Sequence, residues 1–341
     1  MNNMSNNLSG LILLPRLRVQ NANAISGPLS WGFPSPTAFT GFVHALEREL
    51  KQSGQLSDGF AGVGIICHHF EPQVSQPAGR RHRVFCLSRN PVGKDGGAPA
   101  TIEEGRAHME ISLLIGVRDY FSDAEGQYLA EDLQNAAYGM RLAGGSPLFR
   151  PGKRYAASWH TVAGNVTDDT ATFRKLRRRL LPGFALVQRD DLLKAHLAEM
   201  RQAAPASTAL DALLDLSRFN FEPVVTPASE DGKPATVDWQ IRKKPGWLVP
   251  LPMGYAGISD LYEPGQVANT RDASTPFRFV ESLYSLGEWV SPHRIQCFEQ
   301  LLWTQEADAE NGIYRCHNRH AEFISQDNPE SQTSTQEQNH G

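Results

Sequence analysis

The chain has 341 residues, of which 40% are hydrophobic and 21% charged, and its formal net charge is −4. This composition is ordinary for a globular protein with a substantial core. No segment approaches the roughly 20 apolar residues of a membrane-spanning helix, and the first ten residues lack the pattern of a secretion signal. The four cysteines form no CxxC pair, so we predict no metal, no cofactor and reduced thiols in the cytoplasm.

The first predicted element is a strand over Leu11–Val19, an apolar run whose later part alternates. A loop follows, and Ser35 and Pro36 then predict the N-cap and first turn of a helix over Pro36–Gln52. Amides read base edges and aromatic rings stack on bases, so the loop suits single-stranded RNA. Alternatively, the asparagines satisfy the loop backbone and the rings lie in the core or a partner interface. The candidate RNA contacts are Gln20, Asn21, Asn23, Trp31 and Phe33.

Two further strands are predicted over Ala61–Phe70 and Ala107–Val117. The insert between them, Pro72–Arg106, is too long for a plain turn. From 78 to 94 it contains five basic residues and no acid. Guanidinium groups bind phosphate in planar pairs and stack on bases, so the cluster favours RNA contact over a plain exposed loop. Its candidate residues are Arg80, Arg81, His82 and Arg83.

A helix is predicted from an N-cap at Ser122 to about Leu142, ended by Gly144 and Gly145. From 141 to 179, nine basic residues face two acids, whereas from 299 to 341 eight acids face two arginines. This asymmetry indicates a polyanion held by part of the molecule, with glycine N–H groups forming an anion nest. The alternatives are a helix cap with a surface loop and, for 174–179, a solvated helix face. The candidates are Arg141, Gly144, Gly145, Arg150, Lys153, Arg154, Arg177 and Arg178.

The order of elements predicts an α+β fold with a ferredoxin-like (RRM-type) βαββαβ core over residues 11–189. Leu181–Arg189 is the candidate fourth strand. The sequence lacks the aromatic run K/R-G-F/Y-G/A-F-V-x-F/Y of many RRM domains. We therefore expect RNA contacts from loops and from the insert at about 72–106, and not from aromatics stacked on the open sheet.

The second half, 190–324, is predicted to pack on this core as an irregular α/β unit. Residues 1–10 are expected to be a flexible N-terminus, and the polar segment 325–341 is expected to be disordered. Helices are predicted over Asp190–Gln202 and Thr208–Leu216. The apolar segment Gly246–Ile258 is broken by prolines and should form short edge strands or extended core segments. Phe277–Val290 is a strand or a helix, and Pro292–Trp303 is predicted to be a final helix.

Five motifs carry a resemblance to a known family. They are LILLPRLRVQNANAISGPLSWGFPSPTAFTGFVHAL (11–46), FEPQVSQPAGRRHR (70–83), EEGRAHMEISLL (103–114), MRLAGGS (140–146) and LLPGFALVQR (180–189). From about Leu11 to Arg294, the chain resembles the Csy-type Cascade subunits of type I-F CRISPR systems. These are fifth-family Cas proteins that hold the 5′ handle of the guide RNA.

The resemblance implies that the insert is a hairpin-like thumb, with Val84 and Phe85 as wedge residues. It implies a non-catalytic RNA-binding subunit that anchors the guide RNA 5′ handle in antiviral defence, while guide pairing reads the DNA. The implied partners are the large Cascade subunit as a heterodimer, the backbone Cascade subunits, target DNA near this end of the complex, and phage anti-CRISPR proteins. Candidate surface residues for the large subunit are Trp247, Leu248, Tyr255 and Tyr262.

Two other functions stay open. A guide-precursor endoribonuclease would use His82 or His69 as general base, with Glu110 as a further candidate, because metal-free RNA cleavage needs positioned acid–base groups. Structural histidines are the competing interpretation for His44, His68, His69 and His108, and no P-loop, HExxH or GxSxG motif is present. A protein–protein adaptor without direct RNA contact is the other alternative.

Overall fold

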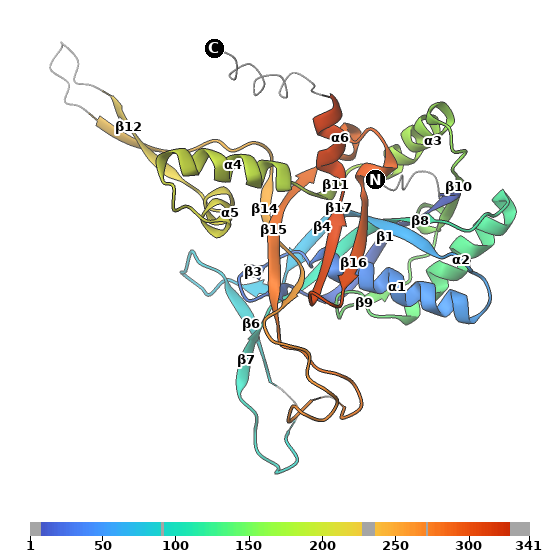
Figure 1. Cartoon of the computed structure of the whole chain (residues 1–341), viewed down its shortest axis with the longest axis horizontal. Coiled ribbons are helices and arrows are strands. Elements are labelled where there is room, and N and C mark those ends of the chain that lie inside the picture. The colour runs from blue at the N-terminus through green and yellow to red at the C-terminus, as the bar shows by residue number, and fades with distance from the viewer. Residues whose placement is uncertain (1–7, 90–91, 227–235, 271, 328–341) are drawn as a thin grey trace.

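The computed structural model describes residues 8–89, 92–226, 236–270 and 272–327 (Figure 1). The helices are α1 (Pro36–Gln52), α2 (Asp123–Gly139), α3 (Val166–Arg179), α4 (Asp190–Ala203), α5 (Ala209–Ser217) and α6 (His320–Asp327). None of these described helices is long and apolar enough to cross a membrane. The strands of the large sheet are β1 (Gly10–Asn23), β4 (Phe60–Pro72), β8 (Arg106–Val117), β9 (Ser146–Leu148), β10 (Ser158–Thr161), β11 (Phe184–Gln188), β14 (Leu248–Gly257), β15 (Val280–Val290), β16 (Leu302–Asp308) and β17 (Ile313–Asn318).

This sheet is antiparallel and follows the order β10-β1-β8-β4-β11-β15-β14-β17-β16, with β9 beside β1 and β16 also pairing with β4. The coarse prediction of a mixed helix and strand fold is confirmed. The sheet takes strands from both sides of residue 189, so the predicted division there stays a prediction. Three small ribbons complete the described strands: β2 (Ile25–Gly27) with β3 (Ser30–Trp31), β5 (Val74–Ser75) with β6 (Val84–Arg89) and β7 (Thr101–Glu104), and β12 (Phe221–Thr226) with β13 (Thr236–Ile241).

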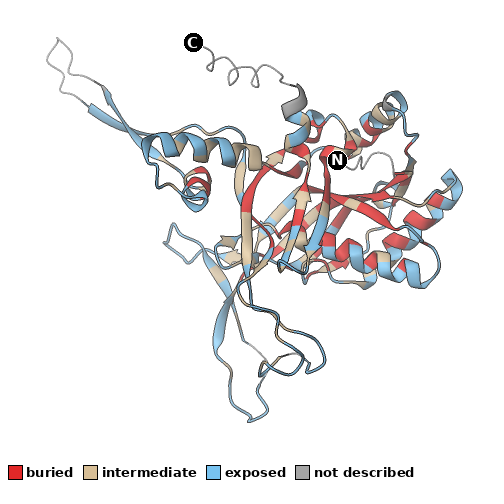
Figure 2. Cartoon of the chain, in the orientation of Figure 1, coloured by how far each residue is buried: buried red, intermediate tan, exposed pale blue. Residues whose placement is uncertain are grey.

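The core lies on both faces of the sheet. On one face, Phe39 and Leu46 of α1 lie in one apolar cluster with Ile12 and Leu14 of β1. On the other face, Phe173 of α3 lies in a second apolar cluster with other strand residues. Burial of each such side chain contributes about 1.5–3 kcal/mol. Figure 2 shows these buried residues concentrated in the sheet and on the helix faces toward it, while the β6–β7 and β12–β13 ribbons are exposed.

The two long helices of the first half begin where their capping residues predict. The Ser35 hydroxyl accepts a hydrogen bond from the Thr37 N–H at 3.1 Å and donates to the Pro252 carbonyl at 2.8 Å, which ties α1 to β14. Ser122 and Glu125 form a reciprocal capping box at α2. The predictions for both helix starts are confirmed.

The predicted end of α2 is wrong by three residues, because the helix stops at Gly139 and its cap Met140 is extended. Gly144 and Gly145 instead form the turn that leads into β9. A Cβ on Gly145 would lie 2.6 Å from the Gln20 carbonyl oxygen, so glycine is required for β9 to approach β1.

The candidate fourth strand is a strand, but its place differs from the expected one. It pairs with β4 and β15 as β11, whereas β9 and β10 pair with β1. Both strands are short, three and four residues, so the sequence pattern did not reveal them.

The second half confirms α4 and α5 and corrects two other predictions. The segment from Gly246 forms one continuous strand, β14, inside the sheet and not at its edge. The final helix over Pro292–Trp303 is wrong: two 3₁₀ turns (Pro292–Arg294 and Phe298–Gln300) precede β16, whose Leu302 and Trp303 pair with β4. A short apolar run is compatible with both the helical and the strand periodicity, so here the pairing with β4 determines the secondary structure.

The first described residues belong to the folded body. The Ser9 N–H donates to the Val117 carbonyl at 3.0 Å and Leu8 is buried, so residues 8–10 are part of the folded body. Residues 1–7 lie outside the described part. The predicted disordered tail begins inside α6, and residues 328–341 also lie outside the described part.

Candidate nucleic-acid interface

An ion-pair network on the sheet organises the most basic part of the surface. The Glu110 carboxylate on β8 accepts hydrogen bonds from Arg16 and from Arg150, each at 2.7 Å. Burial raises the pKa of Glu110, but the hydrogen bonds from both arginines outweigh it, so the pKa lies below its ordinary value. Glu110 therefore stays ionised and fixes both guanidinium groups.

Arg16 reaches this position because β1 is irregular there. Its φ is 49°, at a bulge between Leu14 and Leu17, and it is only 8% exposed. The other side of its guanidinium donates to the Leu181 carbonyl at 3.1 Å. Such a backbone conformation costs about 1–3 kcal/mol for a non-glycine residue, and it often occurs where a side chain must point into a site.

A groove of about 560 Å³ adjoins Arg16 and is here called the basic groove. Five of the residues that line it are cationic and none is acidic. The remaining wall is formed by Ala156, Ala157 and Ser158 at the start of β10, by Pro15 of β1 and by Leu181 before β11. The lining residues are Pro15, Arg16, Lys153, Arg154, Ala156, Ala157, Ser158, Arg178, Arg179 and Leu181.

A second hollow of about 310 Å³ is connected to the basic groove by the Arg16–Glu110 ion pair, because Arg16 lines the groove and Glu110 lines the hollow. Arg18 lies opposite Glu110 on the neighbouring strand. His108 contacts Gln73, whose amide also donates to the Asn21 side chain at 2.5 Å. The second hollow is lined by two arginines, Arg18 and Arg150, and by two acids, Glu71 and Glu110. The two hollows together form a track with seven lysine and arginine residues and two acids in its lining.

The structure brings four predicted residues to this track. Lys153, Arg154 and Arg178 line the basic groove, and Arg150 lines the second hollow. The Arg150 guanidinium also lies 3.8 Å from the centre of the Tyr155 ring, which fixes its orientation. These cations come from the β9–β10 connection and from α3, two segments that the strand pairing of β10 with β1 holds near Arg16.

The predicted loop from Gln20 to Asn23 is instead the end of β1. Gln20 pairs with Ser146 of β9, and Asn21 has a φ of 55° at a second bulge. The Asn23 side chain exchanges hydrogen bonds with the backbone of Ile25, which matches the alternative role in the loop backbone. Arg141, at the same edge of the sheet, donates to the Ser146 hydroxyl.

Three further predicted residues make contacts that match the alternative, structural roles. The Phe33 ring stacks on Phe39 at 5.4 Å between ring centres and meets Trp289 edge-on at 4.9 Å, so it packs on the core. Arg177 donates to two carbonyls of the 292–295 turn. The Gly145 N–H donates to the Leu142 carbonyl and is not free for a phosphate.

The insert is the β6–β7 hairpin, which projects from the body (Figure 1). The Trp31 ring packs on Phe85 at 4.8 Å between ring centres, which holds the base of the insert against β3. Arg80, Arg81, His82 and Arg83 are exposed, and none forms an ion pair within residues 8–89, 92–226, 236–270 and 272–327. Their predicted role in RNA binding stays a prediction.

The sequence interpretation missed Arg16 and Arg18, considered Arg179 only as part of the basic run 174–179, and considered Glu110 only as a possible general base. The only sequence signal was the alternation PRLRVQ, which points Arg16 and Arg18 to one face of a regular strand. Arg16 needed the bulge as well, and the approach of α3 brings Arg179 to Ser158 with a hydrogen bond of 2.6 Å.

Only two of the histidines suggested for catalysis lie in the same described hollow. His68 bonds through its two ring nitrogens to the Pro182 carbonyl and the Ser112 hydroxyl, each at 2.6 Å, and burial lowers its pKa. His69 and His108 line the second hollow. In the residues that the structure describes, no group of three or more His, Cys, Asp and Glu side chains is arranged to hold a metal ion.

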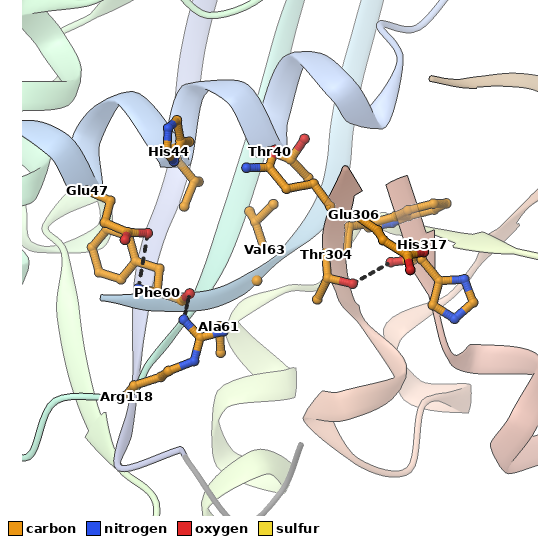
Figure 3. A pocket seen from close by; sticks show the side chains of 14 residues that line it. Thr40, His44, Glu47, Phe60, Ala61, Val63, Arg118, Thr304, Glu306 and His317 are labelled. Carbon is orange, nitrogen blue, oxygen red and sulfur yellow. Dashed lines mark hydrogen bonds between the residues drawn. The ribbon is translucent and has the colours of Figure 1, made fainter. Parts of the chain in front are cut away.

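A separate pocket of about 530 Å³ lies between α1, β4 and β16 (Figure 3). Its Glu47 carboxylate accepts the Phe60 N–H, and Arg118 donates to the Phe60 carbonyl. His44 and His317 also line it. It shares no lining residue with the basic groove, so it is a different surface.

Beside the basic groove, His160 makes stability depend on pH. Burial, with Arg179 nearby, lowers the pKa of His160 to about 4, and burial lowers that of His320 to about 4. The unfolded chain binds these protons near pH 6.5, so the stabilisation is complete above pH 6.5 and is lost as the pH falls toward 4. We expect the free energy of unfolding to decrease by about 2 kcal/mol per histidine between pH 6.5 and 5.

Urea unfolding at pH 7.5, 6.5, 5.5 and 5.0 measures this dependence. The variant His160→Gln should remove the contribution of His160, about 2 kcal/mol between pH 6.5 and 5, and leave those of His68 and His320. An identical slope in His160→Gln would show that His160 titrates normally in the folded chain.

Comparison with known proteins places this geometry in a family. The model of the Cas_Csy2 family of CRISPR-associated proteins matches residues 12–316. The CRISPR-associated protein Csy2 of Pseudomonas aeruginosa (strain UCBPP-PA14) is 53% identical over 309 residues, which are 89% of this chain and 94% of that protein. The resemblance noted in the sequence is confirmed. The chain belongs to the Csy2 family of CRISPR-associated proteins.

Proposed function

We propose that the chain is a non-catalytic subunit of a type I-F Csy surveillance complex that anchors the 5′ handle of the guide RNA. The single observation that carries the RNA-binding part is the basic groove, with five cations and no acid in its lining. Phosphate contacts by arginine and lysine supply most of the affinity of such interfaces. Membership in the Csy2 family supports the assignment to the complex.

In this proposal the cations of the track are of two kinds, those held by an ion pair and those exposed to solvent. Glu110 holds Arg16 and Arg150 in place, which lowers the entropy cost of their contacts with phosphate, while its negative charge offsets part of theirs. Lys153, Arg154 and Arg178 are exposed at the groove rim and supply further charge. Gln20 and Asn21 lie at the end of β1, where amides can read bases.

The insert would bind RNA farther from the groove. Its four-residue basic segment is exposed, and the hairpin beneath it is held by Trp31 and Phe85. A thumb of this kind projects from the sheet as a separate element, so it can contact the guide next to the handle. The wedge role inferred for Val84 and Phe85 is best suited to Val84, because Phe85 already packs on Trp31.

We also infer that the core is ferredoxin-like. The strand order β9 or β10, β1, β8, β4 with α1 and α2 on one face is the order of a βαββαβ unit. In this interpretation β9 and β10 take the place of the fourth strand, which the sequence assigned to Leu181–Arg189.

The proposed partners are the large Cascade subunit, the backbone subunits and, near this end of the complex, target DNA and anti-CRISPR proteins, all in the cytoplasm. Trp247 is 57% exposed and packs edge-on against Phe184, which is also exposed. Tyr255 is 43% exposed on β14. These aromatic side chains support a protein interface on the second half, since Trp and Tyr are enriched at such interfaces.

Protection of the guide RNA tests this function. We expect a complex purified through this chain, with the large subunit and a guide carrying a type I-F handle, to protect the 5′ handle from nuclease. Crosslinks should map to residues 150–178 and 80–83. A stoichiometric complex without handle protection would support the adaptor. Cleavage of a guide precursor by this chain alone, lost in His69→Ala or His82→Ala, would support the endoribonuclease.

A further inference from the structure

The ribbon of β12 and β13, here called the arm, projects from α4 and α5 away from the sheet (Figures 1 and 2). Residues directly opposite each other in an antiparallel ribbon share a face, and successive residues alternate between faces. One face of the arm is therefore wholly apolar over the described part of both strands. The opposed pairs on it are Phe221 with Ile241, Pro223 with Trp239, and Val225 with Val237.

This apolar face is open to solvent. The exposed fractions are 66% for Trp239, 60% for Val225 and 58% for Phe221. An isolated two-stranded hairpin is marginally stable in water, and an apolar patch of this size on an otherwise polar surface marks an interaction site. The face therefore needs a cover that the rest of this chain does not supply within the described residues.

The base of the arm is fixed. The Asp215 carboxylate of α5 accepts hydrogen bonds from His196 at 2.8 Å, from Arg218 at 3.1 Å and from Arg242 at 2.5 Å. Arg218 precedes β12 and Arg242 follows β13, so one carboxylate holds both ends of the ribbon against α4 and α5. The arm is thus presented in one direction, which lowers the entropy cost of docking.

The charges of the arm disfavour a nucleic acid as the cover. The opposite face carries Asp238 and Glu222, and no lysine or arginine occurs at 219–226 or 236–241. Glu222 lies 3.6 Å from Arg242 at the base of the arm. The Asp238 carboxylate would repel a polyanion and would instead complement a basic surface at the edge of the apolar contact.

The size of the face disfavours a second copy of this chain. Two arms packed face to face would bury roughly 500 Å² on each side, given 150–250 Å² for a large aromatic residue. Stable interfaces bury about 800 Å² per partner. A groove that encloses the arm buries more area than a second flat ribbon does.

We propose that the arm docks into an apolar groove with a basic rim on another protein subunit of the complex. This inference rests on the proposed function in one respect, because the partner is sought among the other protein subunits of the proposed complex. Trp239 is the central anchor, since it is the largest apolar side chain on the face.

The test compares substitutions at two neighbouring residues of β13, whose side chains lie on opposite faces of the arm. Trp239→Asp places a charge on the apolar face, and Gln240→Asp places the same charge on the polar face. Each variant is co-expressed with the other subunits and the guide, and subunit stoichiometry is read by native mass spectrometry. In the Trp239→Asp complex, we expect the occupancy of one protein subunit to fall at least tenfold. The Gln240→Asp complex should assemble normally. Val237→Asp should reproduce the loss.

Further measurements separate the outcomes. A photoreactive residue at 225 should crosslink to the lost subunit, and thermal melting should show that each variant is folded. Normal assembly of the complex with the Trp239→Asp variant would overturn the proposal. So would any of three other activities, if Trp239→Asp abolishes it: dimerisation of the chain alone, binding to lipid vesicles, or binding to single-stranded RNA. The subunit could be lost in Trp239→Asp while the guide handle is unprotected in every complex, including the one with the unaltered chain. The proposed function would then be wrong, and the inference about the arm would still be supported.

Discussion

Reversal of two groove charges, Arg154→Glu with Arg178→Glu, is expected to weaken binding of handle RNA by at least about a hundredfold. Both side chains are exposed at the rim of the basic groove, and they approach it from different segments. Charge-assisted hydrogen bonds contribute about 1.5–3 kcal/mol each, and reversal adds repulsion. The logarithm of the affinity should also depend less on the logarithm of salt concentration, with a slope smaller by about two.

The matched control is Arg174→Glu with Lys175→Glu. These residues are exposed on α3 but do not line the groove, so the control makes the same change in net charge. Fluorescence anisotropy with a labelled handle, from 50 to 300 mM salt, measures both pairs. Equal losses in the two double variants would mean that overall charge, and not the groove, holds the RNA. Unaltered binding in both would remove the groove from the interface.

The sequence was sufficient where the signals are local. α1 was predicted to the residue because Ser35 and Pro36 mark its start and apolar side chains recur at helical spacing behind them. β8 was recognised from its alternating run, and β4 from a short apolar run with a glycine-rich start. Their mutual pairing also follows from the insert that joins them.

The candidate site was predictable only in part, because its parts are far apart in the chain. Lys153, Arg154 and Arg178 were found as a basic region, but their convergence on Arg16 depends on β10 pairing with β1. The positive φ of Arg16 has no signature in residue type, since arginine rarely adopts it. The arm was missed for a similar reason: VVT and TVDW are short runs whose pairing register alone reveals an apolar face.

Glu110→Gln is expected to lower stability and to raise RNA affinity at the same time. The substitution keeps the shape of the side chain but removes the charge that Arg16 and Arg150 share. Loss of one partner from a buried pair costs about 3–5 kcal/mol, and the 24% exposure of Glu110 reduces this to about 2–4 kcal/mol. The melting temperature should fall by roughly 4–8 °C. The measurements are thermal unfolding and handle binding.

The affinity should rise because Glu110 is an acid beside a surface that we propose binds phosphate. Its removal adds one net positive charge to the track, and we expect about two- to tenfold tighter binding at low salt that disappears as screening increases. Unchanged stability would mean that the bond from Arg16 to the Leu181 carbonyl suffices without the carboxylate. Weaker binding would mean that Glu110 acts mainly by holding Arg16 and Arg150 in position.

The double variant Glu110→Gln with Arg16→Met separates these two roles. Replacing both partners of a buried ion pair by groups of similar shape is often nearly neutral, so most of the lost stability should return. Affinity should then fall below that of the unaltered chain, because Arg16 itself is gone from the groove. Recovery of stability without loss of affinity would show that Arg16 is a structural residue and that the rim cations alone hold the RNA. The ion pair would then maintain the β1 bulge, and the proposed interface would move outward to Lys153, Arg154 and Arg178.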